Sequence, residues 1–168
     1  MPKTIIIQAS SRSKGDSSKI TQFLQSKIDF DLLDLNTLKI EHYDYNYSNE
    51  KDDFLSTVTT IASNYENIIF ITPIYWYTMS GLLKVFLDRF SDLLKVHKDI
   101  GRSFRGKTVG LISVNNSEAY LKHFEEPIEL SCQYLGMNFK SYVHAPVIDN
   151  QINPTSQIEL IEFGNSFK

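Results

Sequence analysis

Short apolar runs rich in β-branched residues alternate along the chain with longer amphipathic stretches. Such alternation is typical of βαβ units, in which a helix connects two parallel strands. Runs such as residues 68–71 are apolar on both faces, as a parallel sheet covered by helices on both sides requires. The chain is therefore predicted to be a three-layer α/β protein. The expected strands are residues 4–8, 30–35, 68–72, 108–114 and 139–144, and the expected helices are residues 20–28, 54–65, 83–94, 121–135 and 156–163.

Two segments refine these boundaries. Pro127 in a helix interior would remove a backbone hydrogen bond at a cost of about 3 kcal/mol, so the fourth helix is expected to begin near Glu126. Residues 41–53, where tyrosines alternate with polar residues, break the strand and helix pattern. They are expected to form a long loop.

Bulk properties limit the class of protein. The chain has 168 residues, about the length of one domain, so residues 1–168 are expected to form a single domain. A net charge of -3, with basic and acidic residues interspersed, argues against nucleic-acid binding. No segment approaches the roughly twenty apolar residues of a membrane-spanning helix, and residues 5–7 are too short a run for a signal peptide. A cytoplasmic protein without a membrane partner is expected.

Ligands of an open parallel α/β sheet bind beyond the carboxyl ends of its strands, where the strand order reverses. This rule selects the loops after the first, third and fourth strands, residues 9–16, 72–80 and 114–119. The first of them has neither a Gly-x-Gly-x-x-Gly nor a Gly-Lys-Ser/Thr motif, so the dinucleotide fingerprint and the nucleoside-triphosphate loop are both missing. Another kind of ligand is therefore expected.

The first loop is rich in hydroxyl groups instead. Ser10, Ser17 and Ser18 can donate hydrogen bonds, and the helix expected from about Ser17 directs free N–H groups and its positive dipole end at an anion. These donors suit a phosphate monoester, and Arg12 or Lys14 can offset the negative charge of Asp16. The alternative is that Asp16 or Ser17 only caps the helix and the rest is a solvated loop.

The second loop places Tyr75, Trp76 and Tyr77 in succession where a buried strand reaches solvent. Exposed rings there can stack on a planar heterocycle, whose edges the backbone can read. The alternative is a subunit interface or a local hydrophobic plug.

The remaining candidate groups favour structural roles. Lys84 with Asp88, and Arg89 with Asp92, have the spacing of ion pairs on a helix surface. The four histidines show no metal-ligand spacing, and no Gly-x-Ser-x-Gly elbow is present. Cys132 falls on an apolar helix stripe and is expected to pack in the core. We therefore expect neither a metal site nor a catalytic side-chain nucleophile.

Taken together, the loops resemble those of the NAD(P)H-dependent FMN reductase and NAD(P)H:quinone oxidoreductase families. The weaker part of the resemblance is Ser10-x-Arg12-x-x-Gly15-Asp16-Ser17, which is similar to a Ser-x-Arg-x-x-Gly-Asn-Thr phosphate loop. Its strongest part runs from Pro73-x-Tyr75-Trp76 through Met79-Ser80-Gly81-x-x-Lys84-x-x-x-Asp88-Arg89. The resemblance implies a flavodoxin-like fold with a five-stranded parallel sheet in the order 2-1-3-4-5.

The resemblance also implies a role for each loop in binding FMN. The residues that would hold the phosphate are Ser10, Arg12, Ser17 and Ser18. The residues that would line the isoalloxazine are Pro73, Ile74, Tyr75, Trp76 and Tyr77. The third loop, with Asn115 and Asn116, would meet the far edge of the flavin. Many relatives have glycines in this third loop, and residues 115–118 contain none.

The implied activity is ping-pong hydride transfer from NADPH or NADH to flavin N5, and then to a small acceptor of the quinone, flavin, azo or nitro type. Members of these families are commonly dimers in which the partner helps to close the flavin site, so a homodimer or homotetramer is expected. Leu82, Val85 and Arg89, which lie off the core stripe, would then have a use at the interface. Two other functions stay open, a flavodoxin-type electron carrier without its own NAD(P)H oxidation and a non-catalytic binding relative. A flavodoxin would be far more acidic than -3.

Overall fold

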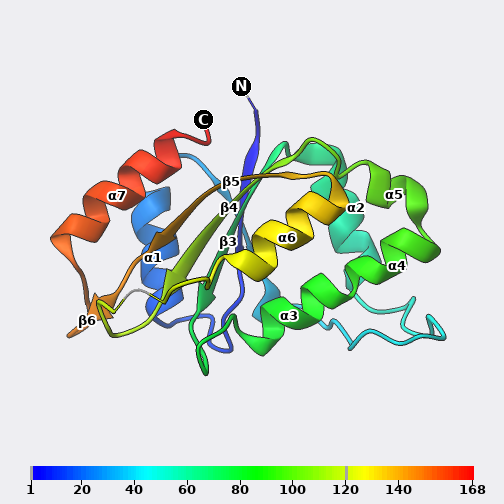
Figure 1. The fold of residues 1–168 in the computed structure, drawn as a ribbon, viewed down its shortest axis with the longest axis horizontal. Coiled ribbons are helices and arrows are strands. Elements are labelled where there is room, and N and C mark those ends of the chain that lie inside the picture. The colour runs from blue at the N-terminus through cyan, green and yellow to red at the C-terminus, as the bar shows by residue number, and fades with distance from the viewer. Residues whose placement is uncertain (1, 120) are drawn as a thin grey trace.

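The computed structural model describes residues 2–119 and 121–168. Five strands form one parallel sheet in the order β2-β1-β3-β4-β5, which confirms the predicted fold (Figure 1). The strands are β1 (Thr4–Gln8), β2 (Asp31–Asp34), β3 (Asn67–Pro73), β4 (Thr108–Val114) and β5 (Asn138–His144). Each lies within about two residues of its predicted boundaries.

Helices cover both faces of the sheet. Residues from α1 (Asp16–Gln25) and α7 (Pro154–Asn165) share one hydrophobic cluster with the sheet. Residues from α2 (Phe54–Asn64), α3 (Gly81–Asp88), α4 (Phe90–Lys95) and α6 (Glu126–Leu135) share the other. Figure 1 shows the same division, with α1 and α7 on one side of the sheet and the remaining helices on the other. Pro127 lies in the first turn of α6, as predicted.

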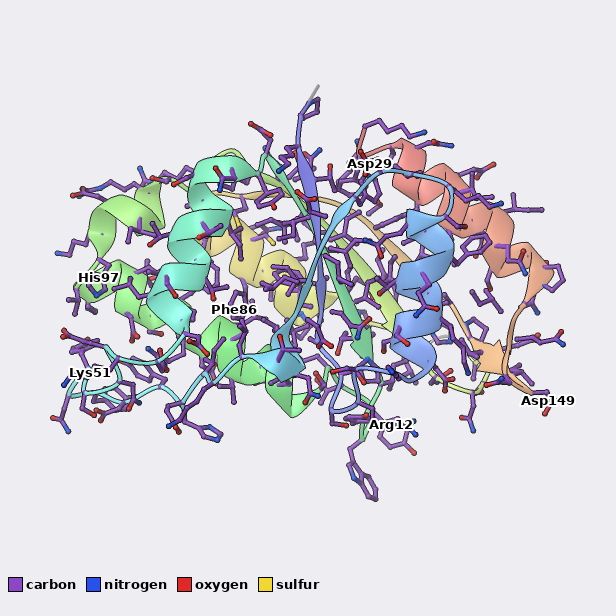
Figure 2. The ribbon with its side chains drawn as sticks, turned by 180° about the vertical axis from the view of Figure 1, so that it is seen from behind. Arg12, Asp29, Lys51, Phe86, His97 and Asp149 are labelled. Atoms are coloured by element: carbon purple, nitrogen blue, oxygen red, sulfur yellow. The ribbon has the colours of Figure 1, made fainter. Side chains whose placement is uncertain are left out.

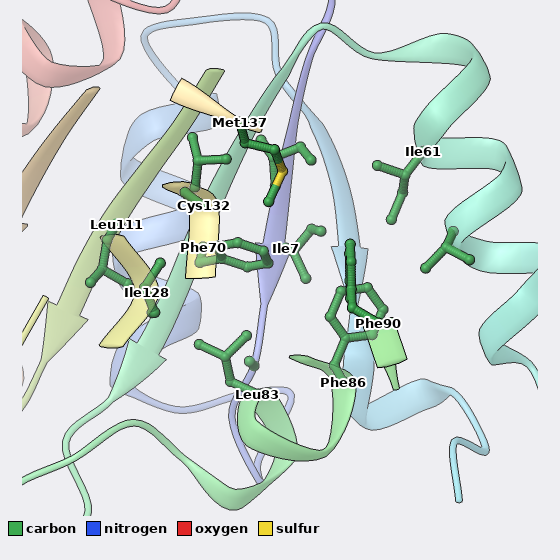
Figure 3. Close-up of a cluster of buried hydrophobic side chains, with 14 of the residues drawn as sticks. Ile7, Ile61, Phe70, Leu83, Phe86, Phe90, Leu111, Ile128, Cys132 and Met137 are labelled. Carbon is green, nitrogen blue, oxygen red and sulfur yellow. The ribbon is translucent and has the colours of Figure 1, made fainter. Parts of the chain in front are cut away.

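The two clusters draw on alternate residues of the same strands. Ile5 and Ile7 belong to the larger cluster, whereas Ile6 between them belongs to the smaller one. This explains why the strands are apolar at every position, since both faces of each strand are buried. Figure 3 shows the larger cluster, in which Cys132 lies among core side chains. Burial raises the pKa of the Cys132 thiol to about 12, so the prediction of a packing role is confirmed.

One glycine of the central sheet is required by packing. A Cβ atom on Gly110 of β4 would lie 2.5 Å from the ring of Phe167 and 2.6 Å from the ring of Phe163. These two rings of the last helical segment pack directly onto the strand backbone, so a larger residue at position 110 would push that segment off the sheet.

The predicted helix over residues 83–94 is divided in two at Arg89. The backbone makes a tighter, 3₁₀-type turn there, in which the Asp92 N–H donates to the Arg89 carbonyl, three residues back, at 2.9 Å. The Arg89 side chain is also buried, at 3% exposure, and does not lie on the helix surface. The interpretation of Arg89 and Asp92 as a surface pair is therefore wrong. The pair Lys84 and Asp88, by contrast, is an exposed ion pair at 2.5 Å, as predicted.

Buried Arg89 connects the long loop of residues 41–53 to the helices. Its guanidinium forms ion pairs with Asp52 and Asp92, donates to the Glu41 carbonyl at 3.0 Å, and stacks 4.7 Å from the ring centre of Phe54. Burial raises the pKa of Asp52, but hydrogen bonds from Arg89 and from backbone N–H groups outweigh burial and hold that pKa below its usual value. The carboxylate is thus kept ionised as the partner of Arg89.

Three small elements were not predicted. They are the 3₁₀ turn η1 (Leu35–Thr37), the short helix α5 (Lys98–Arg102), and a hairpin of β6 (Val147–Ile148) and β7 (Gln151–Ile152). The hairpin turns through Asp149 and Asn150, both with positive φ, which Asp and Asn tolerate better than most residues. Within the described residues, no helix is long and apolar enough to cross a membrane.

Replacing Arg89 with alanine should lower the free energy of unfolding by about 3–5 kcal/mol, because Asp52 and Asp92 would stay buried without their cation. Urea denaturation followed by circular dichroism measures this change. Lys84→Ala, which removes an exposed ion pair one turn away, is the matched control and should change stability by less than about 0.5 kcal/mol. Similar losses in the two variants would contradict a structural role for the buried network.

Candidate functional site

The loops after β1, β3 and β4 meet at one end of the sheet, because these neighbouring strands are parallel. Hydrogen bonds between the strand ends fix them: the Ala9 N–H donates to the Ile71 carbonyl at 2.8 Å, and the Ile74 N–H to the Val114 carbonyl at 2.9 Å. In Figure 2, Arg12 marks this end of the molecule and Asp29 lies at the opposite end. The loops selected from the sequence are therefore brought together.

The first turn of α1 leaves its N–H groups available. Gly15 is the N-cap residue and provides no side-chain cap, and the first helical bond is donated by the Lys19 N–H to the Gly15 carbonyl at 3.3 Å. The N–H groups of Asp16, Ser17 and Ser18 precede that bond and have no carbonyl of the same helix to bind. They form a donor set for an anion at the positive end of the helix dipole.

The serines of this loop differ in what their hydroxyl groups bind. The Ser17 hydroxyl is buried and has no hydrogen-bond partner, which is costly unless a ligand supplies one. The Ser18 hydroxyl donates to the Gly15 carbonyl at 2.8 Å, so its own backbone N–H is the donor left for a ligand. The Ser10 oxygen, also buried, accepts weakly from the Arg12 N–H at 3.4 Å. These contacts fit an incoming phosphate, with Ser17 as the best-placed hydroxyl.

Charge around the helix start favours an anion. The exposed Arg12 side chain folds back over Gly15, since a Cβ atom on Gly15 would lie 3.6 Å from Arg12 Nε. The Asp16 carboxylate, which could repel a phosphate, forms an ion pair with Lys19 at 2.7 Å. Lys19 also donates to Asn150 in the hairpin turn. The negative charge of Asp16 is thus offset within the first turn.

The aromatic loop is a tight two-residue turn. Tyr75 and Thr78 exchange backbone hydrogen bonds of 3.0 and 3.2 Å, and Trp76 and Tyr77 occupy the turn with φ of 50° and 66°. Left-handed backbone costs a bulky residue about 1–3 kcal/mol and clusters at functional sites. Trp76 is nevertheless 92% exposed and Tyr77 78% exposed. The structure thus holds large aromatic rings in solvent on a strained turn.

Two contacts connect the aromatic turn to the first loop. The Tyr75 hydroxyl lies 3.1 Å from the Ser11 hydroxyl. The Ser80 hydroxyl donates to the Ala9 carbonyl at 2.6 Å and accepts from the Leu83 N–H as the N-cap of α3. Pro73 and Ile74, at the base of the turn, are partly buried. Ser11 and Ser80 were not among the residues predicted for the site, although a serine before Gly81-Leu82-Leu83 is a recognisable N-cap signal.

The third loop carries Asn115 and Asn116 at the same end of the sheet. The Asn115 side chain accepts from the Ser117 N–H at 2.8 Å, and Asn116 is exposed. An open cleft of about 880 Å³ runs between β5 and α7 and adjoins this loop at Glu118 and His144. Among residues 2–119 and 121–168, no group of three or more His, Cys, Asp or Glu side chains could hold a metal ion.

Comparison with known proteins agrees with this geometry. The family model described as NADPH-dependent FMN reductase matches residues 2–145. The protein YwqN of Bacillus subtilis (strain 168), whose name describes an NAD(P)H-dependent FMN-containing oxidoreductase, is 28% identical over 151 residues, which cover 84% of this chain and 83% of YwqN.

Solved structures share the fold at low sequence identity. The Trp repressor binding protein of Bacillus subtilis superposes with a TM-score of 0.71 at 23% identity, over 98% of this chain and 97% of the other. FerB of Paracoccus denitrificans, a flavoenzyme NAD(P)H:(acceptor) oxidoreductase, gives 0.73 at 17% identity, over 99% and 95%. General stress protein 14 of Treponema denticola, solved in complex with FMN, gives 0.64 at 17% identity, over 99% and 95%.

The fold is a flavodoxin-like three-layer α/β fold, and its first loop and aromatic turn meet at one end of the sheet. The chain belongs to the NADPH-dependent FMN reductase family, since the family model spans most of it. Its class is NAD(P)H-dependent FMN oxidoreductase, and its cofactor is FMN. The family, enzyme class and cofactor predicted from the sequence are thereby confirmed.

Replacing Ser17 with alanine should weaken FMN binding about tenfold, because a hydrogen bond to a charged group is worth about 1.5–3 kcal/mol. The same change should leave the stability of the FMN-free protein unaltered or slightly raised, because the hydroxyl has no partner there. Quenching of FMN fluorescence measures the affinity, and thermal unfolding measures the stability. Ser26→Ala, at the far end of α1, is the control. An unchanged affinity for Ser17→Ala would remove this hydroxyl from the site.

Proposed function

We propose that this chain transfers hydride from NADPH or NADH to bound FMN and then to a small electron acceptor, in a ping-pong cycle. The observation that carries the proposal is the pairing, at one end of the sheet, of a buried hydroxyl without a partner and an exposed aromatic turn. The Ser17 hydroxyl and the start of α1 suit a phosphate, and the turn suits a flat ring system. FMN has both parts.

The proposed phosphate site consists of Ser17, the uncapped N–H groups of α1 and the guanidinium of Arg12. Ser10 and Ser18 complete it, Ser10 through its hydroxyl and Ser18 through its backbone. The helix dipole and Arg12 offset the phosphate charge, while the ion pair of Asp16 with Lys19 limits repulsion. These residues hold the cofactor and take no part in bond making.

The proposed ring site is formed by the turn and the third loop. Its residues are Pro73, Ile74, Tyr75, Trp76 and Tyr77, with Asn115 and Asn116 at the far edge. The exposed rings of the turn can cover an aromatic ligand, and backbone N–H groups beside it can stabilise negative charge on the ring system. The chain thus orients the ring and tunes its electrostatics.

Bound FMN supplies hydride acceptance and donation at N5, so the chain itself needs no nucleophile. The burial of Cys132 and the raised pKa of its thiol agree with a chain that uses no nucleophile of its own. The solvent-exposed turn would leave the nicotinamide and the acceptor access to the bound cofactor in succession. We propose quinone-, flavin-, azo- or nitro-type acceptors for this second half of the cycle.

We also propose a homodimer or homotetramer in the cytoplasm. Large apolar side chains on the outer face of α6 support an assembly: Leu130 is 57% exposed and Tyr134 is 79% exposed. Leu82 and Val85 are partly exposed on α3. The earlier suggestion that Arg89 serves an interface is wrong, because its side chain is buried within the chain.

Anaerobic addition of NADPH or NADH should bleach the visible absorbance of protein-bound FMN within seconds, because ordinary turnover runs at about 1–1000 per second. Stopped-flow absorbance measures the reduction, and a second mixing step with a quinone should restore the colour. A flavodoxin-type carrier would bleach only with a partner reductase or dithionite. A protein that binds no FMN would be a non-catalytic relative, and either result would reject the proposed reaction.

Replacing Trp76 with alanine should weaken FMN binding or slow turnover by about twofold to tenfold, because a stacked aromatic contact is worth about 0.5–1.5 kcal/mol beyond its buried area. The free energy of unfolding should stay the same, since the Trp76 side chain is 92% exposed. Tyr45→Ala, which removes an exposed ring from the loop of residues 41–53, is the matched control. Equal behaviour of the two variants would leave the aromatic turn without a role in binding.

A further inference from the structure

The third loop keeps an ordinary backbone although it has no glycine. Among the described residues, the non-glycine positions with positive φ all lie outside residues 115–119. The loop therefore does not need the conformational freedom of glycine. Hydrogen bonds hold it instead, from the Val147 N–H to the Asn115 carbonyl at 2.8 Å and from the Ala119 N–H to the Ser117 hydroxyl at 3.1 Å.

A third support for this loop comes from the imidazole of His144, at the end of β5. Its Nε2 lies 2.9 Å from the Ser117 carbonyl oxygen, and its Nδ1 lies 2.9 Å from the hydroxyl of Ser113. The same Ser113 hydroxyl lies 2.7 Å from the hydroxyl of Tyr142. Ser113 is fully buried in β4, so the imidazole bridges the sheet core and the loop backbone.

The chemistry of the acceptor fixes the direction of this chain of hydrogen bonds. A carbonyl oxygen only accepts, so His144 Nε2 must carry the proton. In a neutral ring, Nδ1 is then an acceptor and takes the proton of the Ser113 hydroxyl. The Ser113 oxygen in turn accepts from the Tyr142 hydroxyl. The bonds therefore run from Tyr142 through Ser113 and His144 to the Ser117 carbonyl, with every donor matched to an acceptor.

We propose that His144 is a positioning residue of the FMN site, which fixes the third loop by tying the Ser117 carbonyl to the buried Ser113. The inference rests on the proposed function, in which Asn115 and Asn116 meet the flavin edge. A loop that is already held in place loses less conformational freedom when the cofactor binds. In this chain the imidazole bridge holds a loop that contains no glycine.

A purely structural role makes a different prediction from a positioning role. If His144 only filled space beside β4, an apolar ring of similar size would serve equally well. If it positions the loop, the replacement must both accept from Ser113 and donate to Ser117. His144→Phe removes both bonds, whereas His144→Gln offers an amide oxygen and an amide N–H and should restore part of the function.

The first test compares the FMN affinity of the wild type with that of His144→Phe and His144→Gln by fluorescence quenching. His144→Phe should bind about tenfold more weakly, because two net hydrogen bonds support the loop, and His144→Gln should fall between the two. His97→Gln, a partly buried histidine at the start of α5 and far from Arg12 in Figure 2, should bind as the wild type does. Equal affinities for wild type and His144→Phe would overturn the inference.

A double-mutant cycle tests whether Ser113 and His144 act as one chain. Ser113→Ala should weaken FMN binding, and adding it to His144→Phe should cause little further loss. Fully additive losses would show independent effects and would overturn the bridge.

The last test needs no cofactor. Hydrogen exchange of the FMN-free protein should be faster at the amides of Ser117 and Ala119 in His144→Phe than in the wild type, with His97→Gln unchanged. Unchanged exchange in His144→Phe would reject the positioning role by itself. Failure of the wild type to bind FMN would instead reject the proposed function, so the two failures are distinguishable.

Discussion

Parallel pairing of β1, β3 and β4 is the constraint on which the rest of the structure depends. Because these strands run in one direction, their carboxyl ends share an edge of the sheet, and the three loops that leave them meet there. The same arrangement buries both faces of each strand and requires helices on both sides. Alternate isoleucines of β1 accordingly face separate hydrophobic clusters. The fold and the place of the site thus have a single cause.

Local patterns in the sequence were enough to predict the strands of this sheet, whereas its strand order was implied by the family resemblance. Strands that are apolar on both faces, such as β3, are recognisable without knowledge of their neighbours. The burial of Arg89 could not be predicted from the sequence, since its spacing from Asp92 is the same for an exposed ion pair and for a buried one. Its other partner, Asp52, lies 37 residues earlier in a loop without a periodic pattern. The hairpin of β6 and β7 was missed because two-residue strands carry no periodic signal.

In the candidate site too, some residues could be predicted from their type, whereas one interaction exists only in the folded chain. Residue types at the strand ends were sufficient to select Ser17, Arg12 and the aromatic turn, because hydroxyls, a guanidinium and rings have characteristic partners. The bond from His144 to the third loop could not be predicted, since its acceptor is a backbone carbonyl that exists at that place only after folding. The lack of glycine in that loop was a true observation about the sequence. Its structural meaning depends on hydrogen bonds between separate segments.

The aromatic turn has a consequence for how the protein can be studied. Trp76 is the single tryptophan of the chain. It is nearly fully in solvent and follows Tyr75, whose hydroxyl contacts the first loop. Tryptophan emission from this protein therefore arises at one point, in the aromatic turn of the proposed FMN site. The wavelength and intensity of that emission report, without any added label, whether the Trp76 indole is exposed to water or covered by a ligand.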